Sequence, residues 1–314
     1  MALNPPQIRI GHLSTMYHTA FLLRGTQILS DRGIDASWKL FASGPDIIDA
    51  LQAGTLDLGY IGLPPVIIGI DRGLPLACIA GGHIEGTVMI AGKEIRPLAG
   101  CRNMPEFLSQ FSGKSIGTPP KGSIHDVIVN ELLREHNIYD VTVKNYPWAD
   151  FLSDAITQGE IAAAAGTPAL AVTARRYGTA DLVVHPDKLW PFNPSYGIVV
   201  TRRMLENNDL LLMFLSAHEE ACEQIRHDPR SAARIVATAT GMVDEDFVLD
   251  TYRISPKYCS ALPPEYVSST MKFVRTLHKL GYISHPVSEE AIFEQSLIRT
   301  IHPGNHHYND GITI

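Results

Sequence analysis

One pattern occurs twice in this 314-residue chain, roughly a hundred residues apart. Residues 48–62 and 152–166 each contain a short amphipathic stretch, a glycine, an acidic residue and an apolar run that ends in a Gly/Pro turn. The glycines, Gly54 and Gly159, stand where a glycine ends a helix without Cβ strain. The apolar runs are typical of parallel strands covered on both faces. The repeat therefore predicts two similar α/β lobes, each with a strand-end loop facing a shared cleft.

Strands and helices alternate through the first two thirds of the chain. We expect strands at residues 7–11, 35–41, 74–80, 87–91, 113–117, 141–146, 182–184 and 197–201. This alternation favours mostly parallel sheets flanked by helices. From about residue 229 helical periodicity replaces strands, which predicts a helical C-terminal cap on the first lobe. The turn-rich residues 302–311 predict a partly mobile tail.

Composition excludes several classes of protein. A net charge of −7 with scattered basic residues argues against a nucleic-acid-binding surface, although a helix N-terminus would still attract an anion locally. No run approaches the roughly 18 apolar residues of a membrane span. The four cysteines show no paired spacing, which favours free thiols over a metal ribbon and leaves a single disulfide open.

The start of the sequence leaves the cellular location open. The first expected strand begins at residue 7, with no room before it for a signal peptide. The protein is therefore cytoplasmic if the chain is complete as shown. It is periplasmic, or extracellular and membrane-associated, if an export signal was removed.

Four features, in this order along the chain, carry a resemblance to a known family. They are Gly54-x-x-Asp57 with its strand and Gly62, the turn Gly122-Ser123 after residues 111–117, the second repeat ending in Thr167-Pro168, and Ser195-Tyr196 with the apolar run and long helix that follow. Over about residues 7–260 the ordered set resembles the type II periplasmic substrate-binding proteins of ABC importers. The branch it resembles binds nitrate, taurine, aliphatic sulfonates and thiamine pyrimidines.

The resemblance implies a two-lobed periplasmic-binding-protein type II fold. Residues 1–92 and 198–314 would form lobe 1 with its helical cap, and residues 93–197 would form lobe 2. It also implies a solute-binding protein that captures a small polar or anionic organic molecule (sulfonate-, nitrate- or pyrimidine-like) between the lobes. Its partners would be that ligand and, if the protein is exported, an ABC permease. No catalysis, cofactor or metal is expected.

The resemblance also implies which residues touch the ligand. These are Ser14, Thr15, His18, Gly62, Leu63, Pro64, Gly122, Ser123, Ile124, Thr167 and Tyr196, and we add His83 from a glycine-rich loop. Gly122 and Ser123 open a helix, whose unpaired N–H groups and dipole favour an anionic oxygen. Ser123 would equally serve as the cap of that helix.

Histidines near the expected cleft raise the question of a metal. His12, His18, His83 and His125 with Glu85 would suit zinc or iron if they converged. None has a local chelating spacing such as HxxxH, so we favour hydrogen bonding to a polar ligand.

The alternative function is that of a cytosolic enzyme on the same fold. The examples are a lyase like the chorismate dehydratase of the menaquinone pathway and a protein like the pyrimidine synthase. The cysteine-rich run of the pyrimidine synthase has no counterpart here. Dehydration needs a placed acid–base pair, and only His18 and His83 with Glu85 are candidates. The missing signal peptide favours the enzyme, whereas the long C-terminal helical region and the turn Gly122-Ser123 favour the binding protein, which we prefer.

Overall fold

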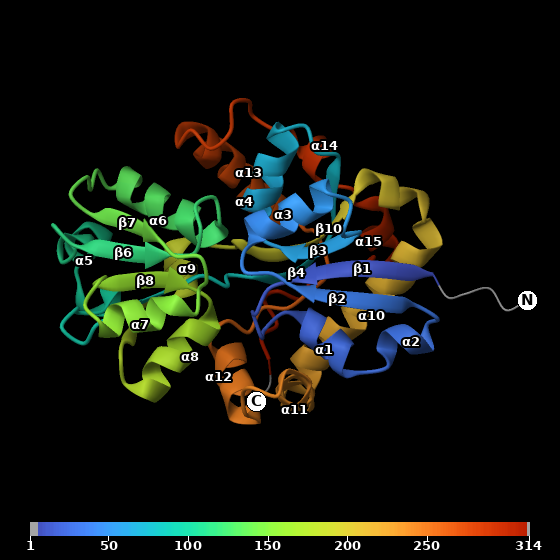
Figure 1. Cartoon of the computed structure of the whole chain (residues 1–314), viewed down its shortest axis with the longest axis horizontal. Helices are drawn as coiled ribbons and strands as arrows, with labels where there is room; N and C mark the ends of the chain where they lie inside the picture. The colour runs from blue at the N-terminus through green and yellow to red at the C-terminus, as the bar shows by residue number, and fades with distance from the viewer. Residues whose placement is uncertain (1–5, 313–314) are drawn as a thin grey trace, which may run out of the picture.

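Two five-stranded sheets lie side by side and form two lobes (Figure 1). The computed structural model describes residues 6–312. The first sheet has the order β2-β1-β3-β10-β4. Its strands are β1 (Gln7–His12), β2 (Asp35–Leu40), β3 (Leu58–Ile61), β4 (Leu76–Ile84) and β10 (Pro194–Thr201). β10 pairs antiparallel with both β3 and β4, while β1 pairs in parallel with β2 and β3.

The second sheet repeats this plan with the order β7-β6-β8-β5-β9. Its strands are β5 (Val88–Ala91), β6 (Ser115–Thr118), β7 (Thr142–Asn145), β8 (Ala163–Gly166) and β9 (Asp181–Val184). Here β5 is the antiparallel strand, next to β8 and β9. The expected fold class, two similar α/β lobes with mostly parallel sheets, is confirmed.

The sequence repeat builds the centre of each lobe. α3 (Gly44–Gln52) precedes β3, and α7 (Phe151–Thr157) precedes β8. Gly54 and Gly159 follow these helices with φ of +66° and +71°, a left-handed conformation that glycine adopts without Cβ strain. The strands lead into α4 (Leu63–Asp71) and α8 (Pro168–Tyr177), so both lobes present a helix start at the end of their central strand.

Helices cover both sheets (Figure 1). The remaining ones before the cap are α1 (Thr19–Gly25), α2 (Ile28–Asp31), α5 (Met104–Ser109), α6 (Ile124–Glu135) and α9 (Pro186–Leu189). The C-terminal helices are α10 (Asn208–His227), α11 (Pro229–Thr240), α12 (Glu245–Ile254), α13 (Pro264–Lys279), α14 (Glu289–Ile292) and α15 (Ser296–Ile301). They pack on the first lobe, α10 and α11 against α1 and α13 against α4, as the expected helical cap.

The cap also reaches the second lobe, with α12 packing against α8 and α13 against α6. The chain crosses between the lobes where β4 leads into β5 and again where α9 leads into β10. At these crossings the Glu85 N–H donates to the Asn193 carbonyl over 2.7 Å. The predicted boundaries at residues 92/93 and 197/198 stay a prediction; β5, on the first-lobe side of residue 92, pairs within the second sheet.

The expected mobile tail is instead packed against the fold. Tyr308 is fully buried, and its hydroxyl donates to the Ala261 carbonyl over 3.0 Å. Its ring also contacts Phe192 and Tyr266. A single aromatic residue thus fixes a segment whose turn-rich composition suggested mobility.

Within residues 6–312, no helix combines the length and the apolar character that a membrane crossing requires. Residues 1–5, on which the expectation about an export signal rests, lie outside the described residues.

Trp190 joins the end of α9 to the cap, which gives a test of the packing. Its buried ring stacks on Phe273 with centroids 4.0 Å apart, and its Nε1–H donates to Ser269 over 3.0 Å. We expect Trp190→Ala to lower the free energy of unfolding by about 3–5 kcal/mol, measured by urea denaturation. Tyr139→Ala, at a side chain 80% exposed, is the control and should change it by less than about 0.5 kcal/mol. A loss at Trp190 no larger than the control's would contradict the packing described.

Candidate ligand-binding site between the lobes

A small cavity of about 50 Å³ lies between the two lobes. It is lined by Leu13, Ser14, Thr15, Tyr17, His18, Ala42, Ser43, Gly44, Gly62, Pro65, Pro119, Ser123, Ile124, His125, Ala149, Thr167 and Ser195. Apart from Ser195, which lies within β10, the first-lobe residues follow β1, β2 and β3, and the second-lobe residues follow β6, β7 and β8. These are the carboxyl ends of the parallel strands in both sheets, where open α/β folds bind ligands.

Four helices begin at this cavity, and their N-cap residues line it. The N-caps are Ser43 of α3, Gly62 of α4, Ser123 of α6 and Thr167 of α8. The hydroxyls of Ser43 and Ser123 each accept an N–H of their own helix over 3.3 Å. Gly62 and Thr167 make no such side-chain cap bond. In the first turns of α4 and α8 the prolines Pro64, Pro65 and Pro168 carry no N–H. The N–H groups of Leu63 and Ala169, with the partial positive charge of the helix start, are therefore what these helices offer to a ligand.

The cavity wall carries no formal charge. Among residues 6–312, no lysine, arginine, aspartate or glutamate lines it. Burial lowers the pKa of His125 to about 4. Burial, with neighbouring histidines, holds the pKa of His18 well below its usual value. Both imidazoles are neutral at pH 7, so the wall binds through dipoles and hydrogen bonds.

His18 lines the cavity, and one of its ring nitrogens is buried without a hydrogen-bond partner within the described residues. The Thr15 hydroxyl lies 3.0 Å from His18 Nε2, while Nδ1 is buried without a hydrogen-bond partner in the described chain. An unpaired buried polar atom is costly. A hydrogen bond from Nδ1 to a ligand would remove that cost.

Seven of the twelve predicted site residues line this one cavity. They are Ser14, Thr15, His18, Gly62, Ser123, Ile124 and Thr167. The other five are outside the wall: Leu63, Pro64, Gly122 and Tyr196 are next or next but one to wall residues in the chain, and His83 is hydrogen-bonded to the wall residue Ser195. That any of the twelve contacts a ligand stays a prediction.

The five predicted residues that do not line the cavity are either hydrogen-bonded within the protein or buried. Tyr196 is fully buried beneath the cavity with its hydroxyl 3.2 Å from the Thr19 hydroxyl. His83 bonds through both ring nitrogens, to the Ser195 hydroxyl at 3.0 Å and the Ser255 carbonyl at 2.8 Å. The Gly122 N–H donates to a carboxylate oxygen of the α6 residue Asp126 over 2.8 Å.

Leu63 and Pro64 form the first turn of α4, where both are buried. Only the residue before them, Gly62, reaches the cavity.

Sequence reasoning missed other residues of the wall. Ser43 and Gly44 follow β2, and Ala149 follows β7. The general rule that ligands bind at the carboxyl ends of parallel strands, applied to every expected strand, would have found these three residues. Ser195 had no such signal, because it lies within β10.

The histidines weighed as metal ligands do not converge with Glu85. His83 is hydrogen-bonded as above, and Glu85 pairs with Lys257 at 2.6 Å. His12 Nδ1 lies 2.9 Å from its neighbour's carbonyl. In the described part of the chain, the group that does bring three metal-type donors together is Glu219, Cys259 and His302, in the cap.

A wider hollow of about 710 Å³ adjoins the cavity and shares Ser14, Thr15, Ala149 and Thr167 with it. An open hollow of about 850 Å³ lies on the second lobe at the opposite, amino ends of β6 and β8. Since ligands bind at the carboxyl ends in this architecture, we take the small cavity with its wider mouth as the site.

Charged side chains span the mouth of the cleft. Arg176 of α8 pairs with Asp244 at 2.8 Å, and its guanidinium lies 5.2 Å from the ring centre of Phe247. Arg175 pairs with Asp250 of α12 at 3.1 Å. On the other side the Tyr282 hydroxyl donates to Asp126 of α6 over 2.7 Å. The cap therefore holds the second lobe at two places.

Comparison with known proteins identifies the family to which this chain is related. The sequence profile of the NMT1-like family matches residues 1–240. Binding proteins of Brucella abortus and Brucella suis are 24% identical to the chain over 240 residues, which is 73% of this chain and 70% of theirs.

Solved structures agree on the fold. The zinc-bound ligand-binding component of an ABC-type import system from Staphylococcus aureus has a TM-score of 0.79 at 17% identity, covering 95% of this chain and all of that one. The alkanesulfonate-binding protein of Xanthomonas axonopodis has a TM-score of 0.77 at 18% identity, with 93% and 99% covered. The periplasmic nitrate-binding protein of Synechocystis has a TM-score of 0.77 at 13% identity, with 94% and 88% covered.

The buried neutral histidines predict a loss of stability in mild acid. Burial lowers the pKa of His83 to about 3 and that of His125 to about 4, against about 6.5 in the unfolded chain. As the pH falls below 6.5, the unfolded chain takes up protons that the folded chain refuses. Stability is therefore full above pH 6.5 and declines toward pH 4, by about 1.4 kcal/mol per pH unit for each histidine.

Urea denaturation between pH 6.5 and 5, above the range of most carboxyl groups, measures this slope. His227→Asn, at an exposed histidine, should leave the slope unchanged. A flat profile in that window would contradict the buried neutral state.

Proposed function

Because the chain belongs to the NMT1-like family, we propose that it is a solute-binding protein. It captures a small polar or anionic molecule between its lobes and delivers that molecule to the permease of an ABC importer. It performs no chemistry on the ligand. The observation that carries the proposal is the cavity between the lobes on which the starts of α3, α4, α6 and α8 converge.

The wall indicates the chemistry of the ligand. Uncapped N–H groups and an imidazole nitrogen suit acceptor oxygens, and the lack of a charged wall disfavours a ligand that needs a full counter-charge. Nitrate, small sulfonates and pyrimidine-like molecules fit this description. Two structural neighbours are named for binding an alkanesulfonate and nitrate, and in this chain the same classes are the first to test.

The enzyme alternative lacks an acid–base pair positioned at the cavity. Of its candidate acid–base residues, His83 uses both ring nitrogens in hydrogen bonds and Glu85 is paired with Lys257. His18 alone reaches the cavity, without a carboxylate in the wall. General acid–base catalysis needs a partner within hydrogen-bond reach of the reacting atom, so the wall supports binding better than dehydration.

A solute-binding protein of this kind works on the outer side of the cytoplasmic membrane. We therefore place the protein in the periplasm, or extracellular and membrane-associated, as part of the same proposal.

The first experiment identifies what the protein binds. Protein purified without denaturation is weighed by native mass spectrometry, and any bound molecule is released and identified. In parallel, nitrate, small alkanesulfonates and hydroxymethylpyrimidine are screened by thermal shift and calorimetry. One molecule per chain, recovered unchanged after incubation, supports the proposal. Turnover of the ligand, or of chorismate-derived substrates, overturns it.

Filling the cavity should abolish binding without unfolding the protein. Ala149 is half-buried and lines both the cavity and its wider mouth. Ala149→Leu adds three carbons to a space of about 50 Å³, and we expect at least about tenfold weaker binding in calorimetry. Ala53→Leu makes the same change at an exposed position after α3 and should keep full affinity. Equal affinity in both variants would place the ligand elsewhere.

The ion pairs across the mouth should bias the lobes toward the closed arrangement by hinge motion. Arg175→Ala combined with Arg176→Ala removes the arginine interactions of α8 with Asp244, Asp250 and Phe247. We expect a larger radius of gyration for the ligand-free protein in X-ray scattering. Added salt should move the unmodified protein in the same direction, because it screens partly exposed charges. Arg230→Ala, on exposed α11 surface, is the control. An unchanged radius in the double variant would show that these pairs do not hold the lobes.

A further inference from the structure

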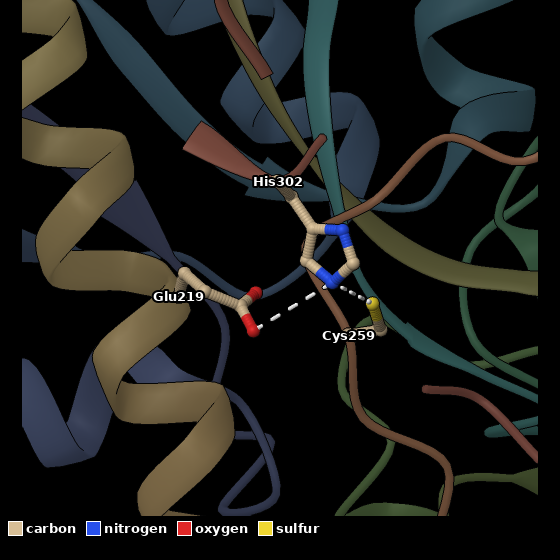
Figure 2. A group of neighbouring side chains, drawn as sticks. All are labelled: Glu219, Cys259 and His302. Carbon is tan, nitrogen blue, oxygen red and sulfur yellow. Dashed lines mark hydrogen bonds and ion pairs between the residues drawn. The ribbon is translucent and has the colours of Figure 1, made fainter. Parts of the chain in front are cut away.

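Three metal-type donors meet inside the C-terminal cap, away from the interlobe cavity (Figure 2). Glu219 extends from α10, Cys259 lies in the segment between α12 and α13, and His302 follows α15. One donor atom from each lies within 4.8 Å of the other two. We propose that these three side chains form a binding site for a divalent zinc-type cation.

The spacing of the donors matches zinc coordination. A tetrahedral zinc ion with its usual bonds to sulfur and nitrogen holds those two atoms about 3.5 Å apart. Here Cys259 Sγ and His302 Nε2 are 3.4 Å apart. The nearer carboxylate oxygen of Glu219 lies 3.9 Å from the same nitrogen, so a small rotation of that side chain completes three corners of a tetrahedron.

The surrounding hydrogen bonds orient the donors. Cys259 Sγ accepts the backbone N–H of Ala261 at 3.5 Å and that of His307 at 3.3 Å, so the sulfur is set up as an acceptor, as a metal-bound thiolate is. The second oxygen of Glu219 accepts the backbone N–H and the hydroxyl of Ser260. Metal ligands are typically held in this way by an outer layer of hydrogen bonds.

The net charge of the proposed site favours a fourth ligand on the ion. Arg226 lies 3.0 Å from Glu219 and balances its charge. A divalent ion with the thiolate then carries a net charge of +1, which favours an anion or hydroxide at the fourth corner. His302 also lines a surface groove of about 420 Å³, which provides both an entry path and space for that ligand.

A bound ion would tie α10 to the segment after α12 and to the end of the chain. We expect the ion to stabilise the folded cap, because it would link three segments that are distant in the sequence. This effect is independent of what the interlobe cavity binds.

The test uses untagged, reduced protein stripped of metal with a chelator and titrated with Co²⁺. We expect a thiolate-to-cobalt charge-transfer band that saturates at one ion per chain and disappears when Zn²⁺ is added. Zn²⁺ should also raise the melting temperature. A wild-type protein that shows neither the band nor the shift overturns the proposal.

Variants locate the ion. Cys259→Ser should abolish the charge-transfer band, and His302→Gln should weaken Zn²⁺ binding about 100-fold. Cys101→Ser and His285→Gln, at a cysteine and a histidine outside the cluster, are the matched controls and should bind like the wild type. The melting curve of each metal-free variant shows whether that variant folds. If Cys259→Ser does not fold, the Co²⁺ titration of the wild type alone tests the proposal. A band that survives in folded Cys259→Ser, or is lost in Cys101→Ser, overturns the assignment.

Discussion

The cleft depends on one geometric constraint, namely that the parallel strands of both sheets end facing each other. At its carboxyl end each parallel strand is followed by a helix. The starts of several helices, with their unpaired N–H groups, therefore lie close together. The sequence enforces this twice, through Gly54 before β3 and Gly159 before β8. Their left-handed conformation turns the chain from a helix back into the central strand of each lobe.

That constraint explains why the wall needs no charged side chain. Backbone dipoles supply the positive potential, and burial keeps the imidazoles of His18 and His125 neutral. Charges appear instead at the rim, where Arg176 and Asp244 join the lobes and remain partly hydrated. Polar recognition and lobe closure are thus assigned to different residues.

Sequence reasoning reached the fold through the repeated local pattern, and through the family resemblance it named seven of the seventeen residues that line the cavity. At β10 it selected Tyr196, the neighbour of the residue that lines the cavity. Ser195 lines the cavity while Tyr196 is buried beneath it, as alternation along a strand requires, and only the register of β10 decides which of the two faces the cleft. The group of Glu219, Cys259 and His302 had no sequence signal, since three distant segments meet only after the cap folds.

The uncharged wall has a kinetic consequence. If the protein holds its ligand through backbone N–H groups, as proposed, the ligand has no strong ion pair to break before leaving, and the barrier to its escape lies in the separation of the lobes. Its residence time then follows the lifetime of the closed form, which the contacts of α8 with α12 and of α6 with the cap control. A partner protein that separates those helices on docking would release the ligand without contacting the cavity.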